Sequence, residues 1–270
     1  MLYMMVSLLL GAAPAPVVLE NTAVRIEVDP QLLAVRYLGA PDGPNLVESL
    51  HVENRQRRQP EGVDAGGITW QVTEGGAPLS PGPADVVAHS EERIVLLTSR
   101  NEESHLRLKV EFMLEGESPE VSMRATVTTD EAGSTLPVAL RCAFRVRPGA
   151  LAGSFVAQAP VLYALDKQGP GTPVNQWDGI LFDAGAVGSQ PLLVSSMGSS
   201  VSMERSGYRV MRVLPEGAAP SASYANAKNL HGVSDPRSQT YGIIMESPKA
   251  QVGPTSPLVY REVWRIATTD

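Results

Sequence analysis

Apolar and polar side chains alternate along several segments of this 270-residue chain. The alternation is clean in 24–28 (VRIEV), runs for nine residues in 106–114 (LRLKVEFML) and returns in 121–127 (VSMRATV). Successive side chains of an extended strand point to opposite faces, so each segment would bury one face and expose the other. We therefore predict β-strands at these three places.

The best place to look for a helix is 84–115, the longest stretch without glycine or proline. Its second half keeps a period of two, which the 3.6-residue period of a helix cannot match. Its first half contains 93–98 (RIVLLT), an apolar run of strand length. No helix of three turns is expected anywhere in the chain.

Turn sequences separate the apolar runs, as in 41–44 (PDGP), 81–83 (PGP) and 116–119 (GESP). Glycine supplies positive φ and proline a fixed φ without a donor, so each of these sequences ends a strand. Many short strands at close spacing predict an all-β protein, an antiparallel sandwich or barrel, of which we favour a large antiparallel sandwich. The segment 149–188 contains more loop-forming residues than the rest of the chain, so it is a candidate for a functional rim at the edge of the sheets. A single domain over 17–270 is favoured over two domains divided in this segment.

Composition and charge restrict the classes of partner. The 24 glycines and 22 prolines argue against a helical bundle, and 43% hydrophobic with 19% charged residues argues against disorder. A net charge of −7 makes nucleic acid an unfavourable partner, since binding it needs a basic face. The basic cluster RQRR at 55–58 stands beside proline and glycine and is interpreted as a solvated loop.

The first sixteen residues, MLYMMVSLLLGAAPAP, form an apolar run followed by small residues. The run is too short for a bilayer-spanning helix, which needs about 20 residues. We interpret 1–16 as a signal peptide with an A-x-A-like site at 13–15, which predicts a periplasmic or secreted protein. The alternative is a cytosolic protein with an apolar first strand.

The sequence offers no complete catalytic or metal-binding motif. Cys142 is the only cysteine and lies in an apolar strand, so it is expected to be buried and inert, without a disulfide or thiolate metal site. Phosphate-binding glycine loops, dinucleotide fingerprints, zinc-protease motifs and the nucleophile elbow are all absent. No metal site and no cofactor are predicted, and oligomeric state is left open.

Four other residues are candidates for contact with a ligand. Glu246 ends the apolar strand 240–246, where desolvation could tune a general base, or where it is an exposed strand-end residue. Trp177 beside Asp178 suits a sugar, with the ring on C–H groups and the carboxylate on hydroxyls, and suits a packed loop equally. His231 is the most site-like of the four histidines, with a turn residue as the alternative.

The order of several features resembles the galactose mutarotase-like superfamily, in a bacterial branch of it, over about residues 18–267. The features are NLV at 45–47, AGGITW at 65–70, FMLEGESP at 112–119, SYAN at 223–226, YGIIMESP at 241–248 and REVWR at 261–265. The resemblance implies an aldose 1-epimerase-like β-supersandwich with a concave carbohydrate-binding face. It also implies that a late glutamate takes the anomeric proton while a histidine protonates the ring oxygen.

Two positions depart from that implied pattern. Glu246 matches the glutamate, but the histidine position falls near Arg141, and the guanidinium of an arginine does not release its proton at neutral pH. The arginine that the family carries after paired glycines is replaced by Ile68 and Thr69.

Three functions follow from these expectations. The first is an exported carbohydrate-binding protein without a complete acid–base pair, in which Arg141 and Glu246 orient the ligand and Trp70 or Trp177 stacks on it. The second is an aldose 1-epimerase-like or other sugar-modifying enzyme with Glu246 as base and His231 as acid. The third is a structural sandwich that docks a protein partner, which 5% aromatic residues make less favourable.

Overall fold

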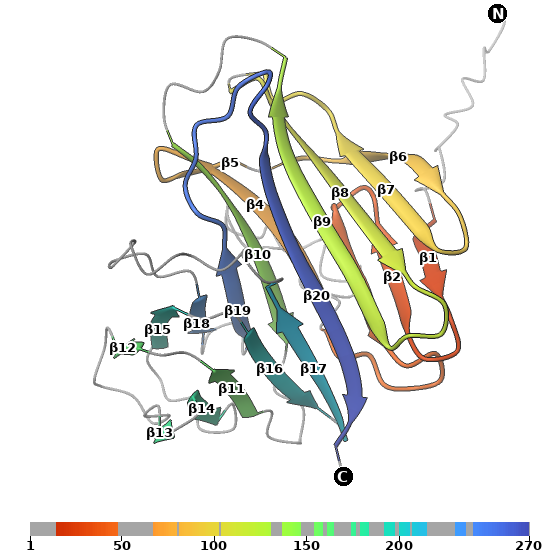
Figure 1. Cartoon of the computed structure of the whole chain (residues 1–270), viewed down its shortest axis with the longest axis vertical. Helices are drawn as coiled ribbons and strands as arrows, with labels where there is room; N and C mark the ends of the chain where they lie inside the picture. Colours follow the sequence, from red (N-terminus) through yellow and green to blue (C-terminus); the bar gives the residue numbers. More distant parts are fainter. Residues whose placement is uncertain are drawn as a thin grey trace, which may run out of the picture.

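The computed structural model consists of two antiparallel sheets that pack face to face (Figure 1). It describes residues 15–47, 67–79, 81–102, 104–130, 137–146, 154–158, 161–164, 174–176, 179–183, 192–197, 200–205, 207–214, 230–235 and 240–269. No helix occurs among these residues, and none of their segments is a helix that could cross a membrane. The predicted all-β antiparallel sandwich is confirmed.

The first sheet has ten strands in the order β1-β2-β3-β4-β10-β19-β18-β15-β12, with β5 added on β4. Neighbours in this order come from distant parts of the chain, so β10 lies between β4 and β19. The strands are β1 (Val17–Glu20), β2 (Arg25–Asp29), β3 (Ala34–Gly39), β4 (Gly67–Glu74), β5 (Ala77–Leu79), β10 (Val138–Val146), β12 (Val161–Ala164), β15 (Leu192–Met197), β18 (Leu230–Asp235) and β19 (Thr240–Glu246).

The second sheet also has ten strands, in the order β13-β14-β11-β16-β17-β20-β9-β8-β7-β6. Its long central strands lie in front of the first sheet in Figure 1. The strands are β6 (Ala84–His89), β7 (Arg93–Thr98), β8 (Leu106–Leu114), β9 (Glu120–Thr129), β11 (Ser154–Gln158), β13 (Val174–Gln176), β14 (Gly179–Asp183), β16 (Ser200–Arg205), β17 (Tyr208–Val213) and β20 (Leu258–Thr268).

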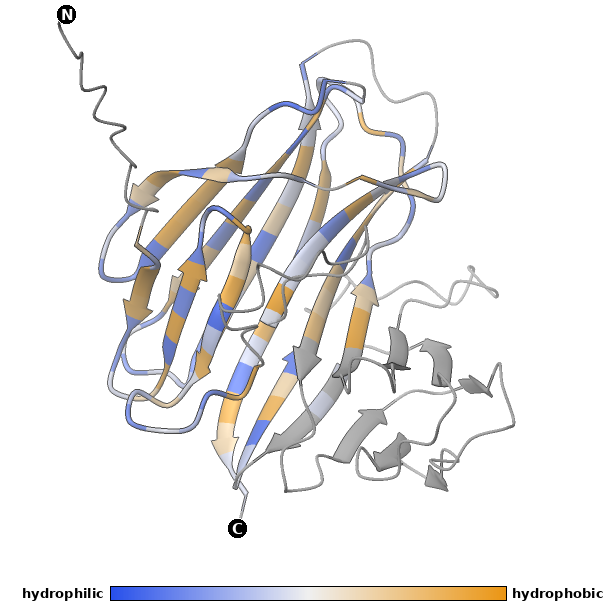
Figure 2. Ribbon diagram, turned by 180° about the vertical axis from the view of Figure 1, so that it is seen from behind, coloured by the Kyte–Doolittle hydropathy of each residue, from blue (hydrophilic) through white to orange (hydrophobic). Residues whose placement is uncertain are grey.

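The alternation of apolar and polar residues in the sequence corresponds to the inward and outward faces of these sheets. β8 buries its even-numbered residues from Leu106 to Leu114, and the odd-numbered residues between them belong to the outward face, as the sequence predicted. The same banding follows the strands in Figure 2, where hydrophobic and hydrophilic residues alternate. The predicted strands at 24–28, 93–98 and 121–127 appear as β2, β7 and part of β9.

Aromatic rings join the two sheets across the core. Trp70 from the first sheet meets Phe112 from the second at 5.7 Å between ring centroids, with the planes inclined at 65°. Phe144 meets Trp264 at 5.0 Å and 88°, so both contacts have the edge-to-face geometry that aromatic pairs favour. Cys142 is fully buried nearby with a free thiol, as predicted, and burial raises its pKa further from neutrality.

A buried ion pair stands in the middle of this apolar core. Arg212 of β17 and Glu262 of β20 make a bidentate pair, with Nε to Oε2 at 2.8 Å and Nη2 to Oε1 at 2.6 Å. Their side chains are 2% and 0% exposed. Tyr260 and Trp264 donate to the same carboxylate, the indole Nε1 at 2.7 Å, so both oxygens of Glu262 have two donors. The guanidinium also lies 4.0 Å from the centre of the Phe144 ring.

Candidate functional site

Arg141 and Glu246 lie side by side on the solvent side of the first sheet. They are register partners on β10 and β19, and Arg141 Nε donates to Glu246 Oε2 at 2.8 Å. The Arg141 side chain is 37% exposed while that of Glu246 is 10% exposed. The carboxylate is therefore largely withdrawn from solvent, and the guanidinium beside it is the accessible member of the pair.

Register extends this pair into a row across three strands. Gln71 of β4 is the register partner of Arg141, so Gln71, Arg141 and Glu246 follow one another across the sheet. Sequence reasoning missed Gln71, although it is the polar residue that directly follows the AGGITW feature at 65–70. The row offers amide, guanidinium and carboxylate groups, which can donate to and accept from adjacent hydroxyl groups.

Ser247 fixes the end of β19 against β10, next to the pair. Its Oγ accepts from Leu140 N at 2.9 Å, and its own N–H donates to Leu140 O at 2.8 Å. Leu140 and Ser247 are the chain neighbours of Arg141 and Glu246. These two hydrogen bonds hold the side chains of Arg141 and Glu246 at the same level along their strands.

The backbone register also brings His231 to this part of the sheet. Position 231 on β18 pairs with Ile244 on β19, and residues 244 and 246 belong to the same face because side chains alternate along a strand. Position 231 is therefore the diagonal neighbour of Glu246 on the adjacent strand. The backbone positions of such diagonal neighbours are about 7–8 Å apart.

Trp70 lies in the core and does not join the row. Trp70 is 3% exposed and its ring packs on Phe112 in the core, because its register partner is the inward-facing Cys142 and not Arg141. This placement does not support a stacking role for Trp70. Trp177 and Asp178 lie outside the described residues.

The buried ion pair lies beneath this row. Arg212 Nη1 donates to Ile243 O at 2.8 Å and Nη2 to Cys142 O at 2.9 Å, so one guanidinium holds the two strands that carry Glu246 and Arg141. Burial would lower the pKa of Arg212, but the Glu262 carboxylate outweighs it and the pKa is raised. Arg212 is thus a permanent cation, and it ties the second sheet to the floor of the site.

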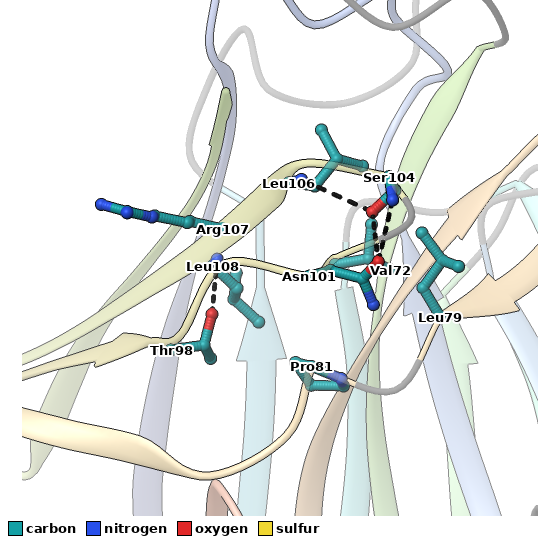
Figure 3. Close-up of a pocket in the computed structure, with 9 residues that line it drawn as sticks. All are labelled: Val72, Leu79, Pro81, Thr98, Asn101, Ser104, Leu106, Arg107 and Leu108. Atoms are coloured by element: carbon teal, nitrogen blue, oxygen red, sulfur yellow. Dashed lines mark hydrogen bonds between the residues drawn. The ribbon is translucent and has the colours of Figure 1, made fainter. Parts of the chain in front are cut away.

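A small cavity lies between β4–β5 of the first sheet and the β7–β8 connection of the second, and no member of the row lines it (Figure 3). Its volume is about 20 Å³, enough for one water molecule and too small for a sugar. Several of its polar groups bond one another or nearby backbone: Asn101 Oδ1 accepts from Ser104 N at 2.9 Å and Ser104 Oγ at 3.0 Å, and Thr98 Oγ1 accepts from Leu108 N at 3.0 Å. We interpret it as packing around the β7–β8 connection.

The donor set of the described residues contains no group of three His, Cys, Asp or Glu side chains placed to hold a metal ion. What the row can do follows from its members. The guanidinium of an arginine donates hydrogen bonds and stays charged, so it can grip an oxygen but cannot deliver a proton. A withdrawn carboxylate can accept a hydrogen bond or, in principle, a proton.

Comparison with solved structures identifies the architecture. An aldose 1-epimerase candidate from Escherichia coli K12 superposes with a TM-score of 0.65 at 13% identity, covering 94% of this chain and 99% of the other. A galactose mutarotase-like protein from Lactobacillus casei ATCC 334 gives 0.64 at 10% identity over 94% and 100%. A galactose 1-epimerase from Lactobacillus acidophilus NCFM gives 0.57 at 10% identity over 94% of each chain. No protein-family model matches the chain, and no curated protein matches it in sequence.

Proposed function

Because the chain has the galactose mutarotase-like fold, we propose that it is a carbohydrate-binding protein whose contact row is Gln71, Arg141 and Glu246. The observation that carries this proposal is the Arg141–Glu246 ion pair on the solvent side of the first sheet. An accessible guanidinium beside a carboxylate suits vicinal hydroxyl groups, one accepting and the other donating.

The same pair argues for binding without epimerisation. Opening and reclosing a sugar ring needs one group that takes the anomeric proton and another that protonates the ring oxygen. Glu246 could serve as the base, but Arg141 occupies the position where the resemblance implies a histidine, and an arginine does not release its proton. The acid half of the pair is missing at that position.

A sugar-modifying enzyme is the second candidate, and the register of β18 favours it. His231 stands one strand from Glu246 on the same face, so an imidazole from β18 could replace the missing acid. Glu246 would then be the general base and His231 the general acid of an aldose 1-epimerase-like reaction.

One experiment separates the two. The protein is mixed with freshly dissolved α-glucose or α-galactose and optical rotation is followed, while binding to a panel of glycans is measured by calorimetry. Saturable binding without acceleration, lost in Arg141→Gln and Glu246→Gln, is the expected result. Arg25→Gln is the matched control, since Arg25 also pairs with carboxylates on the outward side of the first sheet.

Other outcomes overturn the proposal. Faster equilibration that Glu246→Gln and His231→Gln both abolish would establish the enzyme. Absence of binding over the whole glycan panel would remove the carbohydrate function and favour a sandwich that docks a protein partner.

We also propose export to the periplasm or beyond the cell, on the apolar run and small residues of 1–16, of which 1–14 lie outside the described residues. Mass spectrometry of the mature protein tests this. Loss of the segment near residues 13–15 and recovery in the periplasmic or extracellular fraction are expected; an intact amino terminus in the cytosol would refute it.

A further inference from the structure

The outward side of β7, β8, β9 and β20 carries an excess of positive charge. We call it the basic face and define it by the outward positions of these strands, whose charged members are Arg93, Arg107, Lys109, Glu111, Glu120, Arg124, Arg261 and Arg265. Six cations face two carboxylates, a net charge of +4 on a chain whose total is −7. Charge is therefore separated, with the cations gathered on one side of the second sheet.

Most of these cations have a carboxylate. Glu111 Oε1 lies 2.5 Å from Arg93 Nη2 and its Oε2 lies 3.0 Å from Lys109 Nζ. Glu120 pairs with Arg265 at 2.5 Å. Arg107 lies 3.9 Å from Asp130, which follows β9 and is 55% exposed.

Arg124 and Arg261 are the exceptions within the described part of the chain. They are direct register partners on β9 and β20, and no ion pair of either is found there. Glu111 is opposite Arg124 on its other side, but both its oxygens are engaged by Arg93 and Lys109. Side chains opposite each other in a sheet have Cβ atoms about 5 Å apart, where like charges destabilise the pairing.

Unused hydrogen-bonding atoms collect at the same place. Among the described residues, the buried side-chain atoms without a hydrogen bond include Arg107 Nε, Arg124 Nε and Thr126 Oγ1, all on the basic face. Glu111 Oε2 belongs to this group too, though Lys109 is near it, and only Trp70 Nε1 lies elsewhere. Buried polar groups are normally satisfied, so such a cluster calls for an explanation.

We propose that the basic face binds an acidic polysaccharide, with Arg124 and Arg261 together holding one of its carboxylate or sulfate groups. Guanidinium groups form paired hydrogen bonds with such planar or tetrahedral oxyanions. An oxyanion bound between the two cations would offset their mutual repulsion. The site is separate from the Arg141–Glu246 row, which lies on the opposite sheet.

The other side chains of the face favour a polysaccharide over other polyanions. No aromatic residue occupies an outward position of these four strands, so nucleic-acid bases have no stacking partner. Met113 and Val259 are the large apolar side chains more than a third exposed there, and neither is an aromatic anchor for a peptide. Ser122 and Thr128 are half-buried outward residues of β9 that place hydroxyl groups near the cations, which suits a chain rich in hydroxyls.

The test measures binding of fluorescently labelled oligosaccharides by anisotropy. A sulfated heparin fragment and a carboxylated oligogalacturonate are the probes, with neutral maltoheptaose, polyglutamate and single-stranded DNA beside them. We expect saturable, salt-weakened binding of at least one acidic oligosaccharide, weakened about tenfold by Arg124→Gln or Arg261→Gln. Arg25→Gln and Arg141→Gln are the controls that leave it unchanged, the latter keeping this site distinct from the proposed sugar site.

Stability provides the second readout. Because Arg124 and Arg261 oppose each other without carboxylates of their own, Arg261→Gln should leave the urea midpoint unchanged or raise it. A lowered midpoint would mean a structural role and overturn the proposal. Three binding results would also overturn the proposal. They are failure of both acidic oligosaccharides to bind, equal or tighter binding of polyglutamate or DNA, and unchanged binding by the double variant Arg124→Gln/Arg261→Gln.

Discussion

Removing one member of the buried Arg212–Glu262 pair should destabilise the protein more than removing both. The two side chains are 2% and 0% exposed, so a single substitution leaves an uncompensated charge in the core. Breaking a buried pair in this way typically costs about 3–5 kcal/mol of unfolding free energy. We expect Arg212→Met and Glu262→Leu each to reach that range.

The double variant Arg212→Met/Glu262→Leu has a different balance. Replacing a buried ion pair by apolar side chains of similar size often raises the unfolding free energy, by about 1–4 kcal/mol. Here, however, Tyr260 O–H and Trp264 Nε1 lose their acceptor, and each unsatisfied buried donor costs about 1–3 kcal/mol. Taking the middle of both ranges, the double variant should lose about 1–2 kcal/mol, less than either single variant.

Tyr260→Phe makes this reasoning sharper, because its effect should change sign. In the wild-type protein it removes a hydrogen bond to a charged group and should cost about 1.5–3 kcal/mol. In the double variant it removes an orphaned hydroxyl and should stabilise by about 1 kcal/mol. Urea unfolding followed by far-UV circular dichroism compares the wild-type protein with the five variants, including Tyr260→Phe in the double variant. Additive losses in the double variant, or the same cost of Tyr260→Phe in both backgrounds, would refute the account.

Three further substitutions, one of them with a matched comparison, test local features. Arg141→Gln should change the unfolding free energy by less than about 1 kcal/mol because the ion pair is partly exposed; a larger loss in urea would show that the residue is structural. Burial alone would raise the pKa of Glu111, but hydrogen bonds from its two basic neighbours outweigh burial and the native pKa is lowered. The ionised carboxylate therefore stabilises the folded protein fully above the unfolded pKa of 4.5, and this stabilisation is lost as the pH falls through the lower native pKa. Glu111→Gln should therefore flatten the fall in the urea midpoint below pH 4.5, and an unchanged slope would contradict this. Gly39→Ala should cost about 1–3 kcal/mol, since a Cβ there would lie 2.5 Å from the backbone oxygen of Pro44, whereas Gly43→Ala meets nothing nearer than 3.1 Å; equal melting temperatures would contradict the clash.

The sequence predicted the strands better than the neighbours of each strand. Period two along 106–114 is sufficient to predict β8, because alternation is a local property. That β10 lies between β4 and β19 depends on pairing across more than 60 and 100 residues, which no local pattern encodes. The proximity of Arg141 and Glu246 was accordingly inferred from resemblance and not from spacing.

The face of a tryptophan illustrates the same limit. A stacking role for Trp70 requires its ring to face outward, but the register that pairs Trp70 with Cys142 turns it inward. A signal for the core network was nevertheless present. Glu262 stands in phase with Leu258, Tyr260 and Trp264 in an alternating strand, so a charged residue at a buried position could have been predicted.

Arg141→His tests whether the missing acid is what separates this chain from an epimerase. The register that places residue 141 opposite Glu246 is set by the backbone ladder and by the hydrogen bonds between Ser247 and Leu140, so it should survive the substitution. Histidine exchanges its proton near neutral pH, and one well-placed general acid typically contributes about 10²–10⁴-fold. We therefore expect Arg141→His, and not Arg141→Gln, to accelerate the mutarotation of whichever sugar the wild-type protein binds, with the acceleration lost in Arg141→His/Glu246→Gln. A variant that still binds the sugar but leaves its optical rotation to change at the uncatalysed rate would show that the arginine is not the obstacle.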